Sequence, residues 1–437
     1  MRPIVALVAL CSLLGAAPVS GPSTAPESTL RYPTASVTDL GVTKVLSEND
    51  AGAAVSGLQI FVAAGLDRET PSTGGISALV AESILRTPID GVPLRDAIAA
   101  SGGSLSYTVD GRSVHYYLEG RTEHLGALVS LFARAFSAPD FSVATIGAAR
   151  AALATRQKEF EKNALSVGIQ MFRQTYYATS AGGPALGNVS TLAGLGTKDA
   201  VAFYGATYRR AGVMASVVGV VTPELGDALK ALSAGLSDGP VVAVQERAHA
   251  IPAEAPRIVA HREIPAPWVV VGYAAPAPGS RDFGAMLVLE ALLSDAFQRS
   301  STTTLGFVEK PIGAVYLYDS TPASLVVYVN GTQVDPSLAL REVVVVAHSL
   351  SIKPLGAPAL RQFKTAAEGQ FISDSVNLSD RAYLLGTFAS QGLGDDAINA
   401  AMAALDRTTA ADVQRVAKNY LQRYIVALVL PRQSPSP

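Results

Sequence analysis

Apolar and polar positions follow two different patterns along this chain, and each predicts its own type of element. Short runs rich in β-branched and aromatic residues predict strands at 43–46, 57–64, 213–221, 268–274, 323–329 and 424–430. Apolar residues spaced three and four apart predict helices at 73–86, 94–101, 123–136, 143–163, 197–208, 224–236, 283–299, 336–348, 358–371 and 409–420. Residues 104–109 and 113–118 alternate around Asp110-Gly111, which predicts a β-hairpin. The pattern as a whole predicts an α+β fold.

The helix predicted at 73–86 has clear sequence signals at both ends. Ser72 or Thr73 can cap its start, and Pro88 ends it. One side of this helix carries Ile76, Leu79, Val80 and Ser83, and the other carries Ala78, Ala81, Glu82 and Leu85. A helix with small residues and a single carboxylate on one side follows directly from this spacing.

The order of elements returns in the second part of the chain. Leu79–Leu85 aligns with Leu287–Leu293, 208 positions later, and Val201 with Tyr208 aligns with Val413 and Tyr420, 212 positions later. Matches at both ends of each half, in the same order, indicate a duplicated unit. The alternative is that both segments are ordinary amphipathic helices. The duplication predicts two domains, at 36–238 and 258–430, joined by a linker at 239–257 that is rich in Pro, Ala and Val.

The two ends of the chain carry different signals. Residues 1–25 are typical of an export signal, with Arg2 before an apolar run that is too short to span a bilayer. Cys11, the only cysteine, lies inside that run and leaves lipidation open. Residues 26–35 are typical of a disordered spacer, and 431–437 form a loose tail. The expected location is therefore periplasmic or secreted.

Composition narrows the function classes. Hydrophobic residues make up 49% of the 437 residues and charged residues 16%, so the chain can form a sizeable core. The net charge is −2 and no block of like charge occurs, which indicates neither nucleic acid nor an anionic membrane as a partner. No segment of the mature chain is expected to span a membrane.

The histidines do not support an ordinary zinc site. A catalytic zinc needs three protein ligands and an open fourth position. The five histidines are His115, His124, His249, His261 and His348, and no two of them lie three to five residues apart. A helix that presents two imidazoles to one metal ion therefore cannot be built from this sequence. Ala78 and Ala81 can neither bind a metal nor transfer a proton.

With these residues in view, the helix at 73–86 resembles the first-domain helix of the insulinase/pitrilysin-type metallopeptidases, the inverzincins. That family carries Gly-x-x-His-x-x-Glu-His after an extended segment. The lead-in at Ala63–Glu69 and Gly75-Ile76-Ser77 are present here, but Ala78, Ala81 and Glu82 replace the first His, the Glu and the second His. The segments 183–208 and 272–279 resemble the family as well. The resemblance implies two halves, each a mostly antiparallel sheet with helices packed on it, and zinc as the family cofactor, with its ligands absent here.

The resemblance also suggests other site residues. A third zinc ligand in the family is a Glu on a later helix, where Glu159 and Glu161 stand. Without imidazole partners, both residues are better explained as part of a charged, exposed helix face with Lys158 and Lys162. Family chains without zinc ligands can serve as the second subunit of a pair and then hold substrate with an Arg and a Tyr. Tyr316 stands near the expected Tyr, and no arginine stands near the expected Arg.

These observations lead to one hypothesis and two alternatives. The hypothesis is an exported, non-catalytic homologue, a pseudoenzyme that pairs as a heterodimer with an active family member and binds an extended peptide at a sheet edge. The first alternative is an active metalloendopeptidase whose non-standard metal site uses Glu82, Glu159 or Glu161 with a distant His. The second is a structural subunit of an envelope assembly, which predicts no peptide affinity.

Overall fold

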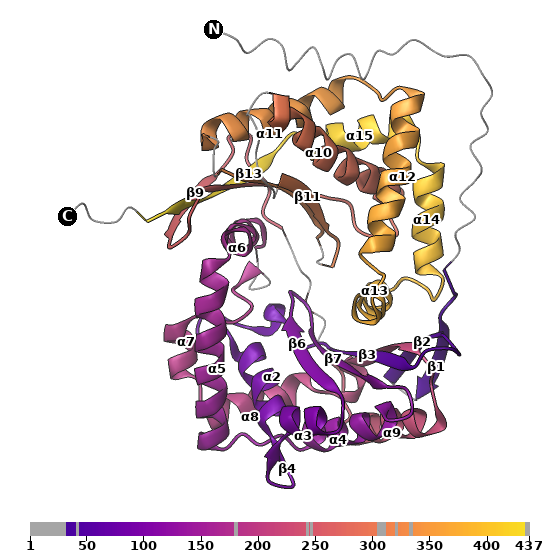
Figure 1. Cartoon of the computed structure of the whole chain (residues 1–437). Coiled ribbons are helices and arrows are strands. Elements are labelled where there is room, and N and C mark those ends of the chain that lie inside the picture. Colours follow the sequence, from indigo (N-terminus) through magenta and orange to yellow (C-terminus); the bar gives the residue numbers. More distant parts are fainter. Residues whose placement is uncertain are drawn as a thin grey trace.

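The α+β fold expected from the sequence is present in the computed structural model (Figure 1). The structure describes residues 32–40, 43–178, 182–241, 244, 248–303, 312–319, 322–331 and 335–432. The expected export signal at 1–25, including Cys11, lies outside the described residues. In the first half the elements are β1 (Ser36–Leu40), β2 (Thr43–Asn49), β3 (Val55–Val62), η1 (Leu66–Arg68), α2 (Ile76–Arg86), β4 (Pro88–Ile89), β5 (Val92–Pro93), α3 (Leu94–Ala100), β6 (Ser104–Val109), β7 (Val114–Arg121), α4 (Leu125–Ser137), α5 (Val143–Lys162), α6 (Ala164–Tyr176), α7 (Val189–Gly194), α8 (Thr197–Thr207), η3 (Arg210–Gly212), β8 (Val213–Gly219) and α9 (Pro223–Ala234).

The second half repeats the arrangement. Its elements are β9 (Arg257–Arg262), β10 (Trp268–Ala274), α10 (Phe283–Thr303), β11 (Ile312–Leu317), β12 (Ser324–Asn330), α11 (Pro336–Ile352), α12 (Ala357–Ser373), α13 (Leu378–Ser390), α14 (Ala397–Arg407), α15 (Ala410–Tyr420) and β13 (Tyr424–Pro431). None of the helices in the described part of the chain is both long enough and apolar enough to cross a bilayer.

The strand order of the two sheets confirms the duplication. The first sheet runs β1-β2-β8-β3-β7-β6, and the second, followed from β9, runs β9-β13-β10-β12-β11. Only β2 with β8 and β9 with β13 pair in parallel, and every other neighbouring pair of these two sheets is antiparallel. The two sheets therefore share five strands in the same order and directions, with β1 added to one edge of the first.

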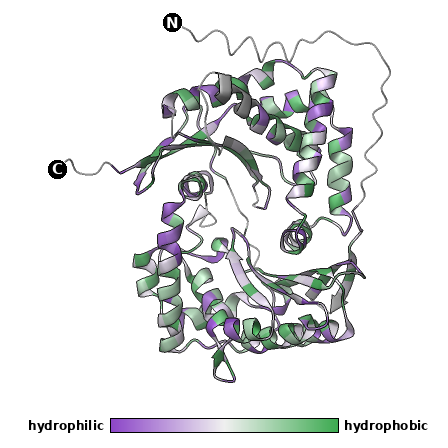
Figure 2. Ribbon diagram, viewed as in Figure 1, coloured by the Kyte–Doolittle hydropathy of each residue, from purple (hydrophilic) through white to green (hydrophobic). Residues whose placement is uncertain are grey.

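Helices cover one face of each sheet, and each half has its own hydrophobic core. The first core contains Phe132 and Phe136 of α4 packed on Tyr116 of β7. The second contains Phe283 of α10 packed on Tyr316 of β11 and on Phe388 of α13. The helices are striped with hydrophobic and hydrophilic residues in Figure 2, as expected for helices that bury one side.

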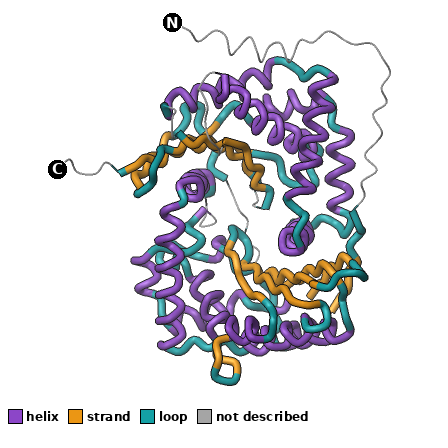
Figure 3. The backbone as a smooth tube through the Cα atoms, viewed as in Figure 1, coloured by secondary structure: helices purple, strands orange, loops and turns teal. Residues whose placement is uncertain are grey.

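Each half also contributes one helix that packs on the sheet of the other half. Helix α6, from the first half, packs on β10 and β13, while α13, from the second half, packs on β3 and β8. Figure 3 shows these two helices nearly end-on between the two sheets. The Ser216 hydroxyl donates to Ala382 O at 2.6 Å, and the Tyr176 hydroxyl donates to Ala323 O at 3.3 Å. The halves are therefore interlocked rather than merely joined by the linker at 239–257.

A glycine lies where each exchanged helix crosses the opposite sheet. A Cβ atom at Gly168 of α6 would come within 2.5 Å of Val270, and one at Gly386 of α13 would collide with the Phe61 ring. The absence of a side chain thus sets how closely each helix can approach its sheet.

Substitution of Gly386 by alanine is expected to destabilise the protein by about 1–3 kcal/mol, because the added methyl group overpacks the α13–β3 contact. Chemical denaturation of the purified chain measures this change. Gly369 provides the matched control, since it is exposed on α12 with no atom within 4 Å of an added Cβ. Gly369→Ala should raise helix propensity and stabilise slightly. Equal effects at the two positions would contradict the close packing described here.

Several elements differ from the sequence-based expectation. Helices α6 and α13, whose sequences were assigned to no element, are regular helices, and so are α7 and α14. The expected disordered spacer at 26–35 is ordered over its last four residues. Tyr32 N–H donates to the Asn399 side chain at 2.9 Å, and Ala35 is buried. The part of the expected tail beyond 432 lies outside the described residues.

Candidate functional site

The start of α2 is shaped by glycine and a buried carboxylate. Gly75 adopts φ 94°, a left-handed conformation that favours glycine, and the helix begins at Ile76. Glu69 accepts hydrogen bonds from Gly75 N–H at 2.9 Å and from Ser77 N–H at 3.0 Å. Burial raises the pKa of Glu69, and the two backbone donors oppose this shift. The expected cap by Ser72 or Thr73 is therefore wrong, since the Glu69 side chain binds the free amides instead.

The residues at the altered motif positions are all buried. Ala78 and Ala81 are 0% exposed and pack in the first core, where neither offers a metal ligand. Glu82 is also 0% exposed. In this buried position Glu82 forms ion pairs.

Three arginines from three helices surround Glu82. Arg86 Nε donates to Oε1 at 2.9 Å, Arg95 Nη2 lies 3.4 Å from Oε2, and Arg156 Nη1 lies 3.8 Å from Oε2. The Arg156 guanidinium also stacks over the Tyr107 ring, 4.7 Å from its centroid. Because guanidinium groups occupy both carboxylate oxygens, Glu82 is not available as an oxygen ligand for a metal.

The other proposed metal ligands are not brought to this place. Glu159 is exposed and forms an ion pair with Lys162 at 2.7 Å, and Glu161 is exposed on the same helix, α5. Within the described ranges, no group of three or more His, Cys, Asp or Glu side chains is placed to hold a metal ion. The donor set around α2 does not fit the family's zinc ion.

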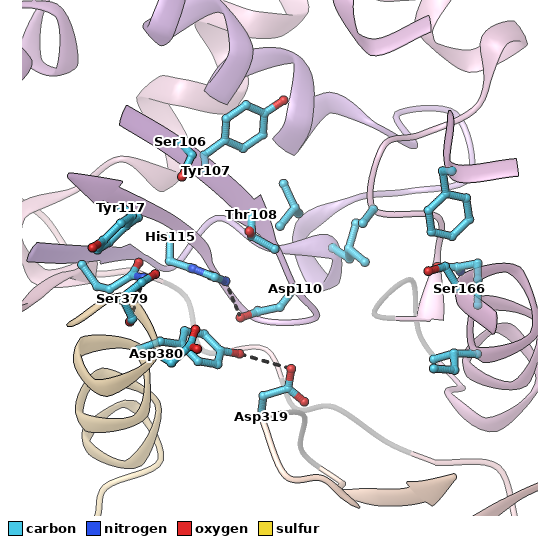
Figure 4. A pocket seen from close by; sticks show the side chains of 18 of the residues that line it. Ser106, Tyr107, Thr108, Asp110, His115, Tyr117, Ser166, Asp319, Ser379 and Asp380 are labelled. Atoms are coloured by element: carbon cyan, nitrogen blue, oxygen red, sulfur yellow. Dashed lines mark hydrogen bonds and ion pairs between the residues drawn. The ribbon is translucent and has the colours of Figure 1, made fainter. Parts of the chain in front are cut away.

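A cavity of 620 Å³ lies between the two halves (Figure 4). Strands β6 and β7 form one wall, α6 a second, and α13 with Asp319 a third. Its lining includes Ser106, Tyr107, Thr108, Asp110, His115, Tyr117, Ser166, Arg173, Asp319, Ser379, Asp380 and Tyr383. Because both halves contribute, this site exists only in the assembled two-domain chain.

His115 lies at the base of this cavity. Its ring stacks on Phe61 and contacts Tyr383, with centroids 5.4 and 4.8 Å away. Nε2 is 3.8 Å from Asp110 Oδ2, and Figure 4 shows this pair beside the bond from the Tyr383 hydroxyl to Asp319. Burial lowers the pKa of His115, and the nearby Asp110 and Asp319 carboxylates oppose that shift. His115 therefore packs between Phe61 and Tyr383 as part of the cavity wall.

Strand β6 presents an open edge to the cavity. It is the last strand of its sheet and pairs only with β7 among the described strands. Asp110 N–H donates to Ser113 O at 2.9 Å, which fixes the first bonded pair of the hairpin. Bonded pairs alternate in an antiparallel ladder, so the backbone groups of Leu105, Tyr107 and Val109 face away from β7. An extended chain can therefore pair with β6.

Tyr316, expected to contact substrate, lies elsewhere. It is 3% exposed, its hydroxyl donates to Pro276 O, and its N–H donates to Glu290 at 2.8 Å. Tyr316 is not among the residues that line the cavity between the halves. Tyr316 is a core residue of the second sheet, and its expected contact with substrate stays a prediction.

Comparison with known proteins agrees with this architecture. Residues 44–188, about a third of the chain, match the family model described as Insulinase (Peptidase family M16). No match was found among curated proteins. A protease from Helicobacter pylori superimposes with a TM-score of 0.80 at 16% identity, covering 92% of this chain and 100% of that one.

Two further solved structures are similar. A putative M16-like peptidase from Alicyclobacillus acidocaldarius gives a TM-score of 0.77 at 15% identity, and a peptidase M16 inactive domain from Pseudomonas fluorescens gives 0.76 at 15%. In each case the alignment covers 92% of this chain and 99% of the other. The fold extends over both halves, whereas the family model covers the part with the altered motif.

Proposed function

We propose that this chain, a member of the insulinase-type metallopeptidase family that lacks the zinc motif, is a non-catalytic subunit that binds an extended peptide. The peptide would add to β6 as a further strand and lie in the cavity between the halves. It would be held by backbone hydrogen bonds, while the exposed side chains of Ser106 and Thr108 contact it from one face.

The open edge of β6 is the observation that carries this proposal. The backbone groups of Tyr107 and Val109, which line the cavity, have no partner among the described strands, and the walls from α6 and α13 leave space for a guest chain. Unpaired strand edges are normally protected by charge, bulges or covering elements. A recessed edge beside a cavity of this volume is therefore suited to pairing with another chain.

A peptide-binding measurement tests this proposal. The probe is a short fluorescent peptide with a hydrophobic residue at every second position, followed by fluorescence polarisation. In an extended peptide, only every second backbone N–H faces β6. Methylation of those nitrogens removes the donors that pair with β6, whereas methylation of the other set does not. That methylated peptide should bind about ten-fold more weakly, since each lost pair of backbone bonds costs on the order of 1 kcal/mol. Methylation in the other register should have little effect.

Two variants of the chain locate the binding edge. Thr108→Trp places a bulky ring in the cavity and should weaken peptide binding by about ten-fold. Thr38→Trp makes the same exchange on exposed β1, at the opposite edge of the sheet, and should leave binding unchanged. Failure of every peptide to bind would contradict the proposal and favour the purely structural subunit.

The same proposal includes a partner and a location. The partner would be a catalytically active family member that carries His-x-x-Glu-His, and the signal-like residues 1–25 would direct export to the periplasm or outside the cell. The inactive domain from Pseudomonas fluorescens supports a non-catalytic role, because it shares this fold. A pull-down from the native envelope should recover the active chain, and recovery of no such chain would contradict the pairing.

The alternative of an active peptidase requires ligands that the described residues do not provide. Glu82 is held by arginines, and Glu159 is paired with Lys162 on an exposed face. Metal analysis of the purified chain, together with Glu82→Ala, separates the two functions. Stoichiometric zinc that is lost in this variant would favour the enzyme.

A further inference from the structure

The ion-pair cluster on α2 has more positive than negative charge. Three guanidinium groups, from Arg86, Arg95 and Arg156, share the single carboxylate of Glu82. Three positive charges against one negative charge leave an excess of two. Each guanidinium has five N–H donors, and one carboxylate accepts only about four hydrogen bonds. Glu82 therefore cannot satisfy the donors of all three arginines.

The cations of this cluster are accessible, whereas its anion is not. The Glu82 side chain is 1% exposed, but those of Arg86, Arg95 and Arg156 are 31%, 42% and 42% exposed. The two arginines with the larger exposure also have the longer distances to Glu82. An anion that approaches from outside would therefore meet Arg95 and Arg156 first.

The cluster also lies next to the strand proposed to bind peptide. Arg156 stacks on the ring of Tyr107, whose backbone groups face the open edge of β6. The Tyr107 hydroxyl donates to Ala78 O at 3.4 Å, so β6 is fixed to the motif helix at this point. A peptide paired with β6 would pass beside Arg156.

We infer that the cluster formed by Arg86, Arg95, Arg156 and Glu82 binds a carboxylate of the peptide that pairs with β6. The carboxylate would be either the C-terminal group or an Asp or Glu side chain. This inference rests on the proposed function and adds a substrate class to it. Arginine suits this task because its planar guanidinium can donate two parallel hydrogen bonds to one carboxylate. Glu82 would hold the three guanidinium groups together against their mutual repulsion.

The test compares three versions of the fluorescent peptide, with a free C-terminal carboxylate, with a C-terminal amide, and with an amide plus one internal glutamate. At least one carboxylate-bearing version should bind about ten-fold more tightly than the uncharged amide at low salt. Comparing the peptide that has a free C-terminal carboxylate with the one that has an internal glutamate identifies which carboxylate is bound. The preference for a carboxylate over the uncharged amide should disappear in the double variant Arg95→Gln/Arg156→Gln, which removes the two more exposed guanidinium groups.

Controls separate failure of this inference from failure of the proposed function. Arg134→Gln removes an exposed arginine that pairs with Asp90 and should preserve the preference. The single variant Arg95→Gln leaves Glu82 bound to Arg86 and provides the measurement if the double variant does not fold. Equal affinity of all three peptides for the wild-type chain would overturn the inference and leave β6 pairing intact. Absence of binding for all three would overturn both.

Discussion

Replacement of Arg381 by alanine is expected to lower the free energy of unfolding by about 3–5 kcal/mol. Arg381, on α13 of the second half, donates through Nε to Glu48 of β2 at 2.7 Å, and Nη2 lies 2.7 Å from the same oxygen. Both residues are buried, at 4% and 8% exposure, and the guanidinium stacks over Tyr32 at 4.0 Å. Removal of the arginine leaves a buried carboxylate without its counterion. Denaturant unfolding, followed by circular dichroism, measures the loss.

Two controls show whether the pair or the packing carries this effect. Exchange of both residues for methionine removes both charges together and should cost less than the single alanine substitution, because no unpaired charge stays buried. Arg134→Ala breaks an exposed pair with Asp90 and should leave the stability close to that of the wild-type chain. A double exchange as damaging as the single one would indicate that packing, rather than charge, dominates at this contact.

Stability should also fall as the pH rises towards 8, because of Glu290. This residue of α10 is buried in the second core and accepts from Tyr316 N–H at 2.8 Å and from the Gln370 amide at 3.3 Å. Burial raises the pKa of Glu290 from 4.5 to about 8, and the charge of Asp374 adds to this shift. The folded state therefore retains a proton that the unfolded chain releases. This contribution to stability is complete below about pH 4.5 and is lost as the pH rises through about 8.

The variant Glu290→Gln isolates this dependence. Glutamine keeps an oxygen for Tyr316 and cannot ionise, so the variant should exceed the wild-type chain in stability at pH 8 by on the order of 3 kcal/mol. Near pH 4.5 the two chains should be similar. Glu161→Gln, on the exposed face of α5, should follow the wild-type profile. Parallel stability curves for Glu290→Gln and the wild-type chain between pH 5 and 8 would rule out a buried, protonated Glu290.

The elements that the sequence predicts well are those whose own residues determine their structure. Strand β3 and the hairpin of β6 and β7 follow from apolar runs and a turn, and the Asp110 side chain accepts from Arg112 and Ser113 N–H groups in that turn. The repeat that relates Leu79–Leu85 to Leu287–Leu293 likewise predicts two similar halves, which the shared strand order confirms. Local periodicity is sufficient for these features.

Helices α6 and α13 show where local patterns were insufficient. The predicted helix at 143–163 matches α5, but the segment after it was assigned to no element, although Asn163 caps α6 there by accepting from Ser166 N–H. Asn377 caps α13 by accepting from Asp380 N–H. These cap signals were present in the sequence. That each helix packs on the sheet of the other half depends on tertiary structure alone.

The candidate site likewise has some features that the sequence predicts and others that depend on tertiary structure. The loss of zinc chemistry follows from the identities of Ala78, Ala81 and Glu82, which any alignment with the motif exposes. Arg86, four residues after Glu82, is a neighbour that helical spacing predicts. Arg95 and Arg156 reach the same carboxylate only because α3 and α5 pack beside α2. The cavity likewise has walls that are far apart in the sequence, so local patterns cannot locate it.

The exchange of α6 and α13 between the sheets has a consequence for synthesis on the ribosome. Helix α13 covers β3 and β8, yet it is translated more than 150 residues after β8 ends at Gly219. That face of the first sheet therefore stays uncovered until most of the chain has been translated. Apolar surface that stays uncovered during this interval makes such an intermediate prone to aggregation.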